Sequence, residues 1–176
     1  MRVWKVTRLI KDRDDYNGVA QFLLSNARLV CDLFRYIASK SAFPAITMLD
    51  VSAFCAECRI IDSKLNTSTV DRAFISAATP NLEGPDNKQA FRDGTKAELL
   101  KLQPEAALTR FQFIEILVRI AGYKYLNQTY SKKGKTITVK TFTQAVKTLF
   151  QENIDLYYYE PSDQFRKEQL WENQVS

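Results

Sequence analysis

"LTRFQFIEILVRIAGYKY", residues 108–125, is the strongest helical signal in the chain. Apolar residues recur in it at steps of three and four, which predicts an amphipathic helix over residues 111–125, entered through a short extended segment. The expected buried stripe consists of Phe113, Ile116, Leu117, Ile120 and Ala121, and the residues expected to face away from much of it are Arg110, Glu115 and Arg119.

Other segments show the same helical period. Helices are expected over residues 16–38, with an interruption near Ser25 and Asn26, and over residues 49–61, 69–78 and 139–154. The segment "NTS", Asn66–Ser68, offers an N-cap for the third of these. Residues 1–15 are expected to form a strand or an arm over the core, and a further helix is expected to begin at Ser162 or Asp163. Residues 79–107 hold three of the five prolines and two of the five glycines, which predicts an irregular insertion with one short helix around residues 96–102.

The composition argues against several classes of function. The chain has 176 residues, 45% of them hydrophobic, which is enough for one well-filled core. No run of about 18 apolar residues occurs, and charges stand where the apolar part of a signal peptide would lie, so we expect no membrane span and a cytoplasmic protein. The chain has no histidine, the side chain that most often transfers protons near neutral pH. We therefore expect no enzyme and no cofactor.

The three cysteines, Cys31, Cys55 and Cys58, are expected to be free and buried. Cys55 and Cys58 have the two-residue spacing of a zinc knuckle. A structural zinc ion needs four ligands, however, and the chain offers one further cysteine and no histidine. We expect no zinc site.

A net charge of +5 leaves open a basic helical module that binds nucleic acid or acidic lipid. The densest basic stretch is residues 131–140, "SKKGKTITVK". It lacks the stacking aromatic residues of a single-strand binder and the recognition helix of a duplex reader, so a solvated loop is the expected structure and nucleic acid is not the expected partner.

A pattern of apolar residues with a polar residue that follows the pairing aliphatic position by four occurs twice between residues 30 and 121, with an acid in the first copy and Gln112 in its place in the second. The first copy consists of Val30, Phe34 and Ile37, then Ile46 and Asp50, then Val51, Phe54 and Cys55. The second copy consists of Val70, Phe74 and Ala77, then Leu108 and Gln112, then Phe113, Ile116 and Leu117. This spacing resembles a pair of EF-hands, in which an aliphatic residue of each calcium loop pairs with its twin and an acid closes the cage.

The resemblance implies an all-α fold whose core, residues 16–126, is a paired degenerate EF-hand lobe similar to half of calmodulin. Residues 1–15 would be an N-terminal arm, residues 79–107 an insertion in the second loop, and residues 127–176 a helical extension that packs on the lobe. It also implies an antiparallel bridge between Ile46 and Leu108. "RFQFIEILVRIAGYKY" and "FRKEQLW" are similar to segments of EF-hand-like proteins of protist cilia and flagella, which implies a structural, cytoskeletal or ciliary role.

Neither loop supplies a calcium cage. A cage takes side-chain oxygens from loop positions 1, 3 and 5, a glycine at 6 and a glutamate at 12. The first loop, "ASKSAFPAITMLD", has Asp50 as its only acid, and the second, residues 78–112, holds five acids against five bases. We expect no calcium binding, although a weak calcium-responsive regulator remains an alternative.

The leading hypothesis is a non-catalytic protein-interaction or scaffold module. The resemblance implies a groove between the two hands that binds an amphipathic helix of another protein. Its candidate lining residues are Phe34, Phe54, Phe74, Phe113, Ile116 and Leu117. Phe165 and Trp171 are candidate anchors by which the C-terminal segment would partly fill this groove.

Overall fold

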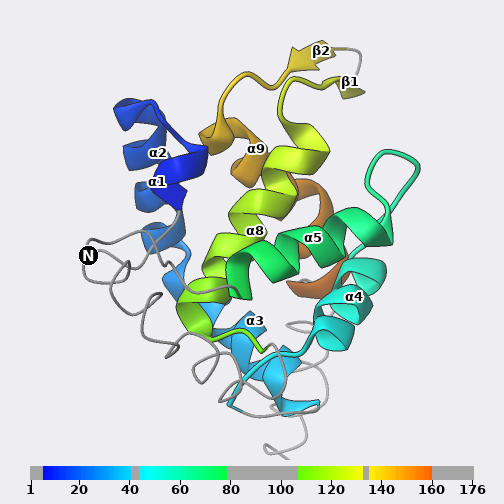
Figure 1. Ribbon diagram of the computed structural model, residues 1–176. Helices are drawn as coiled ribbons and strands as arrows, with labels where there is room; N and C mark the ends of the chain where they lie inside the picture. Colours follow the sequence, from blue (N-terminus) through cyan, green and yellow to red (C-terminus); the bar gives the residue numbers. More distant parts are fainter. Residues whose placement is uncertain (1–5, 41–43, 79–106, 133–134, 160–176) are drawn as a thin grey trace, which may run out of the picture.

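The computed structural model describes residues 6–40, 44–78, 107–132 and 135–159. They form α1 (Val6–Leu9), α2 (Arg13–Ser25), α3 (Ala27–Ser39), α4 (Met48–Glu57), α5 (Thr67–Ala78), α8 (Arg110–Tyr125), β1 (Thr129–Lys132), β2 (Lys135–Thr138), α9 (Phe142–Leu149) and the π-helix η1 (Phe150–Tyr159) (Figure 1). The described chain is mostly helical, as the all-α expectation requires. The expected insertion up to residue 106 and the C-terminal anchors Phe165 and Trp171 lie outside the described residues.

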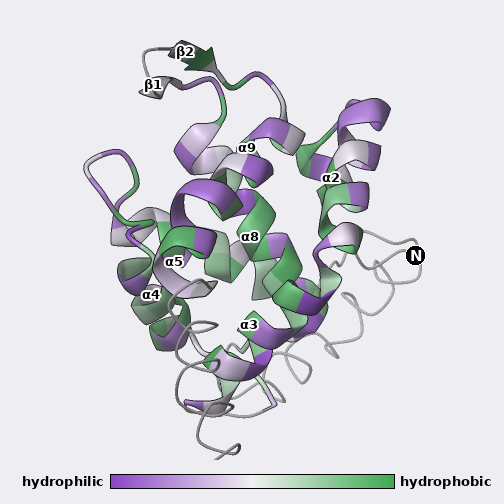
Figure 2. Ribbon diagram, turned by 180° about the vertical axis from the view of Figure 1, so that it is seen from behind, coloured by the Kyte–Doolittle hydropathy of each residue, from purple (hydrophilic) through white to green (hydrophobic). Residues whose placement is uncertain are grey.

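Helix α8 is the centre of the molecule. It contacts α1, α3, α5 and α9 (Figure 1), and most of its hydrophobic residues are buried. Much of its ribbon carries the hydrophobic colour in Figure 2. The expected stripe is buried, and so is Val118 on another side of the helix. The expectation for Glu115 is wrong: its side chain is 1% exposed, and Arg119 Nε and Nη2 donate to Glu115 Oε1 over 3.0 and 2.8 Å. A helix surrounded on several sides buries charge only where a partner charge accompanies it.

The N-terminal part is helical from Val6. The described end of the expected arm forms α1 and not a strand, and α2 begins at Arg13, three residues earlier than expected. The predicted interruption is confirmed at Asn26, which separates α2 from α3 and donates through Nδ2 to Phe22 O over 2.9 Å. Within the segment predicted to cap α5, the capping residue is Asn66, whose Oδ1 accepts from Thr69 N at 3.0 Å.

Asp15 of α2 caps the N-terminus of α9 from a distant part of the chain. Its carboxylate accepts from Phe142 N at 2.7 Å and from Thr143 N at 2.8 Å, and Thr143 Oγ1 also donates to it over 2.7 Å. Two glycines allow the close approach of the helices. A Cβ added to Gly18 would lie 2.5 Å from Thr143 Oγ1, and one added to Gly122 would lie 2.6 Å from Phe142 Cε1. These contacts fix α9 against both α2 and α8.

The basic stretch forms an antiparallel hairpin in place of the expected loop. Thr129 pairs with Thr138, and Lys132 pairs with Lys135. The helix expected over residues 139–154 begins later, at Phe142, and continues as η1 to Tyr159. None of the helices in the described ranges has both the length and the apolar character needed to cross a membrane.

Candidate functional site

Ile46 and Leu108 form an antiparallel bridge, the contact that the repeated spacing predicts. Ile46 N donates to Leu108 O over 3.1 Å, and Leu108 N donates to Ile46 O over 2.8 Å. Both side chains are fully buried. The bridge joins the segment before α4 to the segment before α8. Helices α4 and α8 therefore begin close to each other.

The two helices that follow the bridge begin in the same way. Asp50 Oδ2 accepts from Thr47 N at 2.8 Å and from Thr47 Oγ1 at 2.6 Å. Gln112 Oε1 accepts from Thr109 N and from Thr109 Oγ1, both at 2.8 Å. Each threonine directly follows a bridge residue, and each pair forms a capping box. The segments "ITMLD" and "LTRFQ" carried this signal in the sequence, but our sequence interpretation treated their last residues only as remnants of calcium ligands.

In the spacing pattern described above, Asp50 and Gln112 stand at the position of the acid that closes a calcium cage, and here both side chains are engaged in helix caps. Gln112 also donates through Nε2 to Ala78 O over 3.2 Å, which ties the start of α8 to the end of α5. Within the described ranges, no three Cys, Asp or Glu side chains are grouped so that they could share a metal ion.

The six residues expected to line a groove between the hands are buried, each with at most 3% of its surface exposed. Phe113 packs edge-on against Phe34 and Phe54, with ring centroids 5.8 and 6.3 Å apart. Tyr158 of η1 covers this cluster, 6.1 Å from the ring of Phe54 and 5.0 Å from the ring of Tyr36. In the described structure these six side chains belong to the core and present no open surface, and Tyr158 of η1 contributes to the cover over Phe54.

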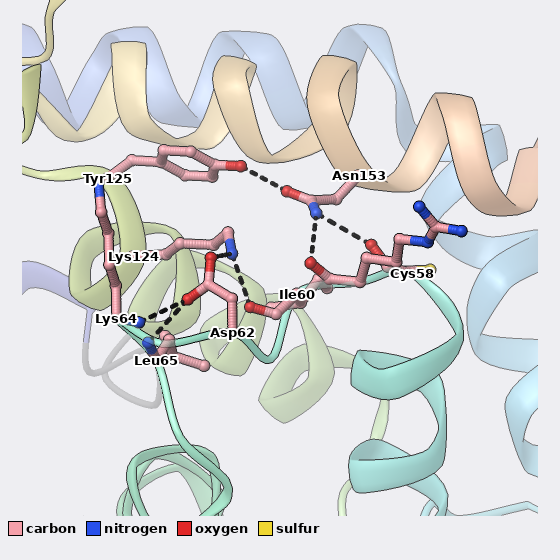
Figure 3. A network of polar contacts seen from close by, with 9 residues as sticks. Cys58, Ile60, Asp62, Lys64, Leu65, Lys124, Tyr125 and Asn153 are labelled. Carbon is pink, nitrogen blue, oxygen red and sulfur yellow. Dashed lines mark hydrogen bonds and ion pairs between the residues drawn. The ribbon is translucent and has the colours of Figure 1, made fainter. Parts of the chain in front are cut away.

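A polar network holds the linker between α4 and α5 (Figure 3). The buried Lys124 of α8 donates through Nζ to Ile60 O over 2.7 Å and to Asp62 Oδ2 over 2.6 Å. Asp62 Oδ1 accepts from Lys64 N at 2.8 Å and from Leu65 N at 3.0 Å. Partial burial favours a higher pKa for Asp62, but the hydrogen bonds from Lys124 and from these two amides outweigh it and lower the pKa.

Asn153 of η1 completes the network. Its Nδ2 donates to Cys58 O over 2.9 Å and to Arg59 O over 3.0 Å, and its Oδ1 accepts from Tyr125 OH at 2.5 Å (Figure 3). Arg59 has a φ of 51°, in the left-handed region, so these bonds support a strained turn. The network was missed from the sequence. One local signal could have indicated it. Lys124 continues the helical spacing of the apolar stripe of α8, which places a lysine on the buried face of that helix.

An apolar groove of about 460 Å³ lies between α2, α3 and the start of α8. Its lining residues are Tyr16, Ala20, Leu23, Leu24, Ala27, Val30, Cys31, Phe111 and Ile114. Leu24 is 80% exposed and Phe111 is 44% exposed. We call this surface the α2–α3–α8 groove. Clustered apolar exposure of this kind marks contact sites more often than isolated surface leucines do.

The cysteines differ from one another. All three are free, and Cys55 and Cys58 are buried, but Cys31 is exposed, which corrects the expectation that all are buried. Burial raises the pKa of Cys58 to about 12 and also raises the pKa of Cys55. These two thiols are poor nucleophiles at neutral pH, because the thiolate is the reactive form.

Comparison of the chain with protein-family models, curated proteins and solved structures gave no significant match.

Proposed function

We propose that this protein is a non-catalytic interaction or scaffold module built on a paired EF-hand-like frame that works without metal. The observation that carries the proposal is the bridge between Ile46 and Leu108, followed on both sides by a like-capped helix. Paired hands share this arrangement of two loops and two exit helices, as the resemblance in spacing implies. A cytoplasmic setting with a cytoskeletal or ciliary role belongs to the same proposal.

The chemistry of the loop residues supports a frame without calcium. Asp50 directs Oδ2 at the backbone and hydroxyl of Thr47, and Gln112 carries no charge to offer a cation. A calcium site needs six to eight oxygen ligands, several of them carboxylates. In this proposal Asp50 and Gln112 cap helices α4 and α8 in place of binding calcium. The caps help to hold the two EF-hand-like units in a constant orientation.

The described side chains favour binding more than catalysis. The chain has no histidine, and the free thiols of Cys55 and Cys58 have raised pKa values. Glu115 and Lys124, the buried charged groups among the described residues, each bond to a partner within the protein. These features support binding in preference to catalysis.

The proposed binding surface is the α2–α3–α8 groove. It is lined almost wholly by apolar side chains and lies between helices, the kind of site in which an amphipathic helix places apolar anchors. Leu24 and Phe111 would contribute most of the contact area, because they are the large lining side chains with most surface still in water. This assigns the partner to a different surface from the one expected between the hands.

Quantitative affinity capture from the source cells tests the proposal. The bait proteins are the wild type, Leu24→Asp in the groove, and Leu49→Asp on α4 as the control. Leu24 and Leu49 are 80% and 82% exposed, so neither change disturbs the core. We expect a set of proteins that binds the wild type and Leu49→Asp but is lost with Leu24→Asp. An identical set of proteins on all three baits would reject the groove as the binding surface.

A further inference from the structure

Another cavity, of about 250 Å³, lies beside the polar network of Figure 3 and is lined by the linker between α4 and α5, the end of α8 and η1. We propose that it binds the phosphate group of a small polar molecule through Arg59, Lys64 and Lys124. Its volume is just below the range of about 300–1,000 Å³ typical of ligand pockets, so it suits a small molecule. This site is separate from the α2–α3–α8 groove and does not rest on the proposed function.

Lys124 gives the cavity a buried ammonium group that still has a hydrogen-bond donor to offer. The side chain is 6% exposed and lines the cavity. An ammonium group carries three N–H donors, and the hydrogen bonds of Lys124 to described residues, at Ile60 O and Asp62 Oδ2, use two of them. A buried donor without an acceptor costs free energy, so an anion oxygen in the cavity would stabilise this group.

The charges around the cavity also favour an anion. Three of the lining side chains are cations and two are acids, Asp62 and Glu152. Asp62 is paired with Lys124 at 2.6 Å, whereas Arg59 and Lys64 are exposed and have no hydrogen-bond acceptor or ion-pair partner among the described residues. The guanidinium of Arg59 lies over the ring of Tyr157, 4.8 Å from its centroid. This contact uses the face of the guanidinium and leaves the N–H groups at its edge able to bind an oxyanion.

The arrangement of the cations suits phosphate better than carboxylate. Arg59 follows α4, Lys64 belongs to the linker and Lys124 belongs to α8, so the three groups come from separate segments. A phosphate monoester presents three acceptor oxygens, one for each cation, and a carboxylate presents two. Gln128 and Glu152, which also line the cavity, can bond to hydroxyl groups on the rest of the ligand.

The backbone around the cavity has two features that are common at binding sites. Arg59 has a φ of 51°, and η1, which contributes Asn153 and Tyr157 to the lining, is a π-helix. Strained residues and π-helical turns both occur frequently at functional sites. Asn153 Nδ2 donates to Cys58 O and to Arg59 O, and these bonds hold the strained turn against η1. The cavity is therefore built before any ligand binds.

Calorimetric titration with inorganic phosphate, at constant ionic strength in a chloride buffer, tests the site. The proteins are the wild type, Arg59→Gln, Lys64→Gln and the control Lys140→Gln, which removes the same charge from an exposed lysine outside the cavity. We expect saturable binding to the wild type and the control, and several-fold weaker binding to the other two variants. Arg59→Lys should lose less affinity than Arg59→Gln, because it keeps the charge. Circular dichroism verifies that each variant is folded.

Two further probes test the ligand class. Glycerol phosphate should bind more tightly than inorganic phosphate, because its hydroxyl groups reach Gln128 and Glu152, and acetate should bind more weakly. The absence of saturable binding by both phosphates, or equal affinity in the wild type, Arg59→Gln and Lys64→Gln, would overturn the proposal. Acetate that binds as tightly as phosphate would reject the phosphate assignment. Binding to phosphatidic acid vesicles without binding of the soluble phosphates would assign these cations to a membrane surface. No partner protein is involved, so failure here is distinguishable from failure of the affinity capture.

Discussion

Asp50 and Gln112 make the same contact in two different helices. Each accepts hydrogen bonds from the backbone N and the side-chain Oγ1 of a threonine three residues earlier, and each stands four residues after a member of the Ile46–Leu108 bridge. A helix cap needs a hydrogen-bond acceptor and no particular charge, which explains why Asp serves in one copy and Gln in the other.

The first prediction concerns these caps. Asp50→Ala should lower the free energy of unfolding by about 1–2 kcal/mol, because it leaves the amide and the hydroxyl of the N-cap residue Thr47 without their acceptor. Asp50→Asn should keep most of that stability, since its amide oxygen can accept the same bonds. Urea denaturation of the three proteins measures the difference. Equal losses in the Ala and Asn variants would mean that the charge matters and the cap does not.

Asp15 provides a second test, of a cap supplied from another helix. Asp15→Ala should destabilise the protein by about 2 kcal/mol, because a carboxylate that accepts from two backbone amides at a helix N-terminus makes strong bonds. The control is Asp14→Ala, which removes an exposed acid from the same first turn of α2. Comparable unfolding midpoints for the two variants would contradict the remote cap.

The pairing of Asp62 with Lys124 predicts a dependence on pH. The pKa of Asp62 is lower in the folded chain, so this carboxylate contributes stability above its ordinary pKa of about 3.9 and loses the contribution as pH falls through the lower folded value. The wild type should therefore exceed Asp62→Asn in stability at pH 6, and the gap should narrow below about pH 4. Chemical denaturation across this range measures the gap. A gap that widens in acid would reverse the assigned direction.

The thiols should differ in reactivity. In the native protein at neutral pH, Cys31 should react rapidly with an aromatic disulfide reagent, whereas Cys55 and Cys58 should react only after unfolding, because they are buried and have raised pKa values. Cys31→Ser should abolish the rapid phase and leave the other two thiols titratable in denaturant. Rapid native labelling in that variant would show that Cys55 or Cys58 is accessible.

Calcium should not stabilise the protein specifically. A ligand that binds only the folded state adds about 2.7 kcal/mol at roughly 100 times its dissociation constant, so a melting experiment detects even a weak site. Millimolar Ca²⁺ and Mg²⁺ should produce the same melting temperature. A rise with Ca²⁺ alone, removed by Asp50→Asn, would restore the alternative of a calcium-responsive regulator.

Local signals accounted for several elements in advance. The start of α8, expected at Phe111 and found at Arg110, the break near Asn26 and the cap within residues 66–68 all depend on neighbours within a few positions. The same local reasoning failed for Glu115, because a helical period assigns charge to the outer face. Its burial results from the other helices that surround α8, and these come from distant parts of the sequence.

The sequence by itself determined where most described helices lie and, through its repeated spacing, which two residues form the bridge. Only the tertiary structure decided which apolar surfaces stay in contact with water. Phe54 is buried between Phe113 and Tyr158, which comes from the end of the described chain, whereas Leu24 is 80% exposed beside a groove. Helix formation depends on local backbone and side-chain preferences, but exposure depends on which remote element packs over a given face.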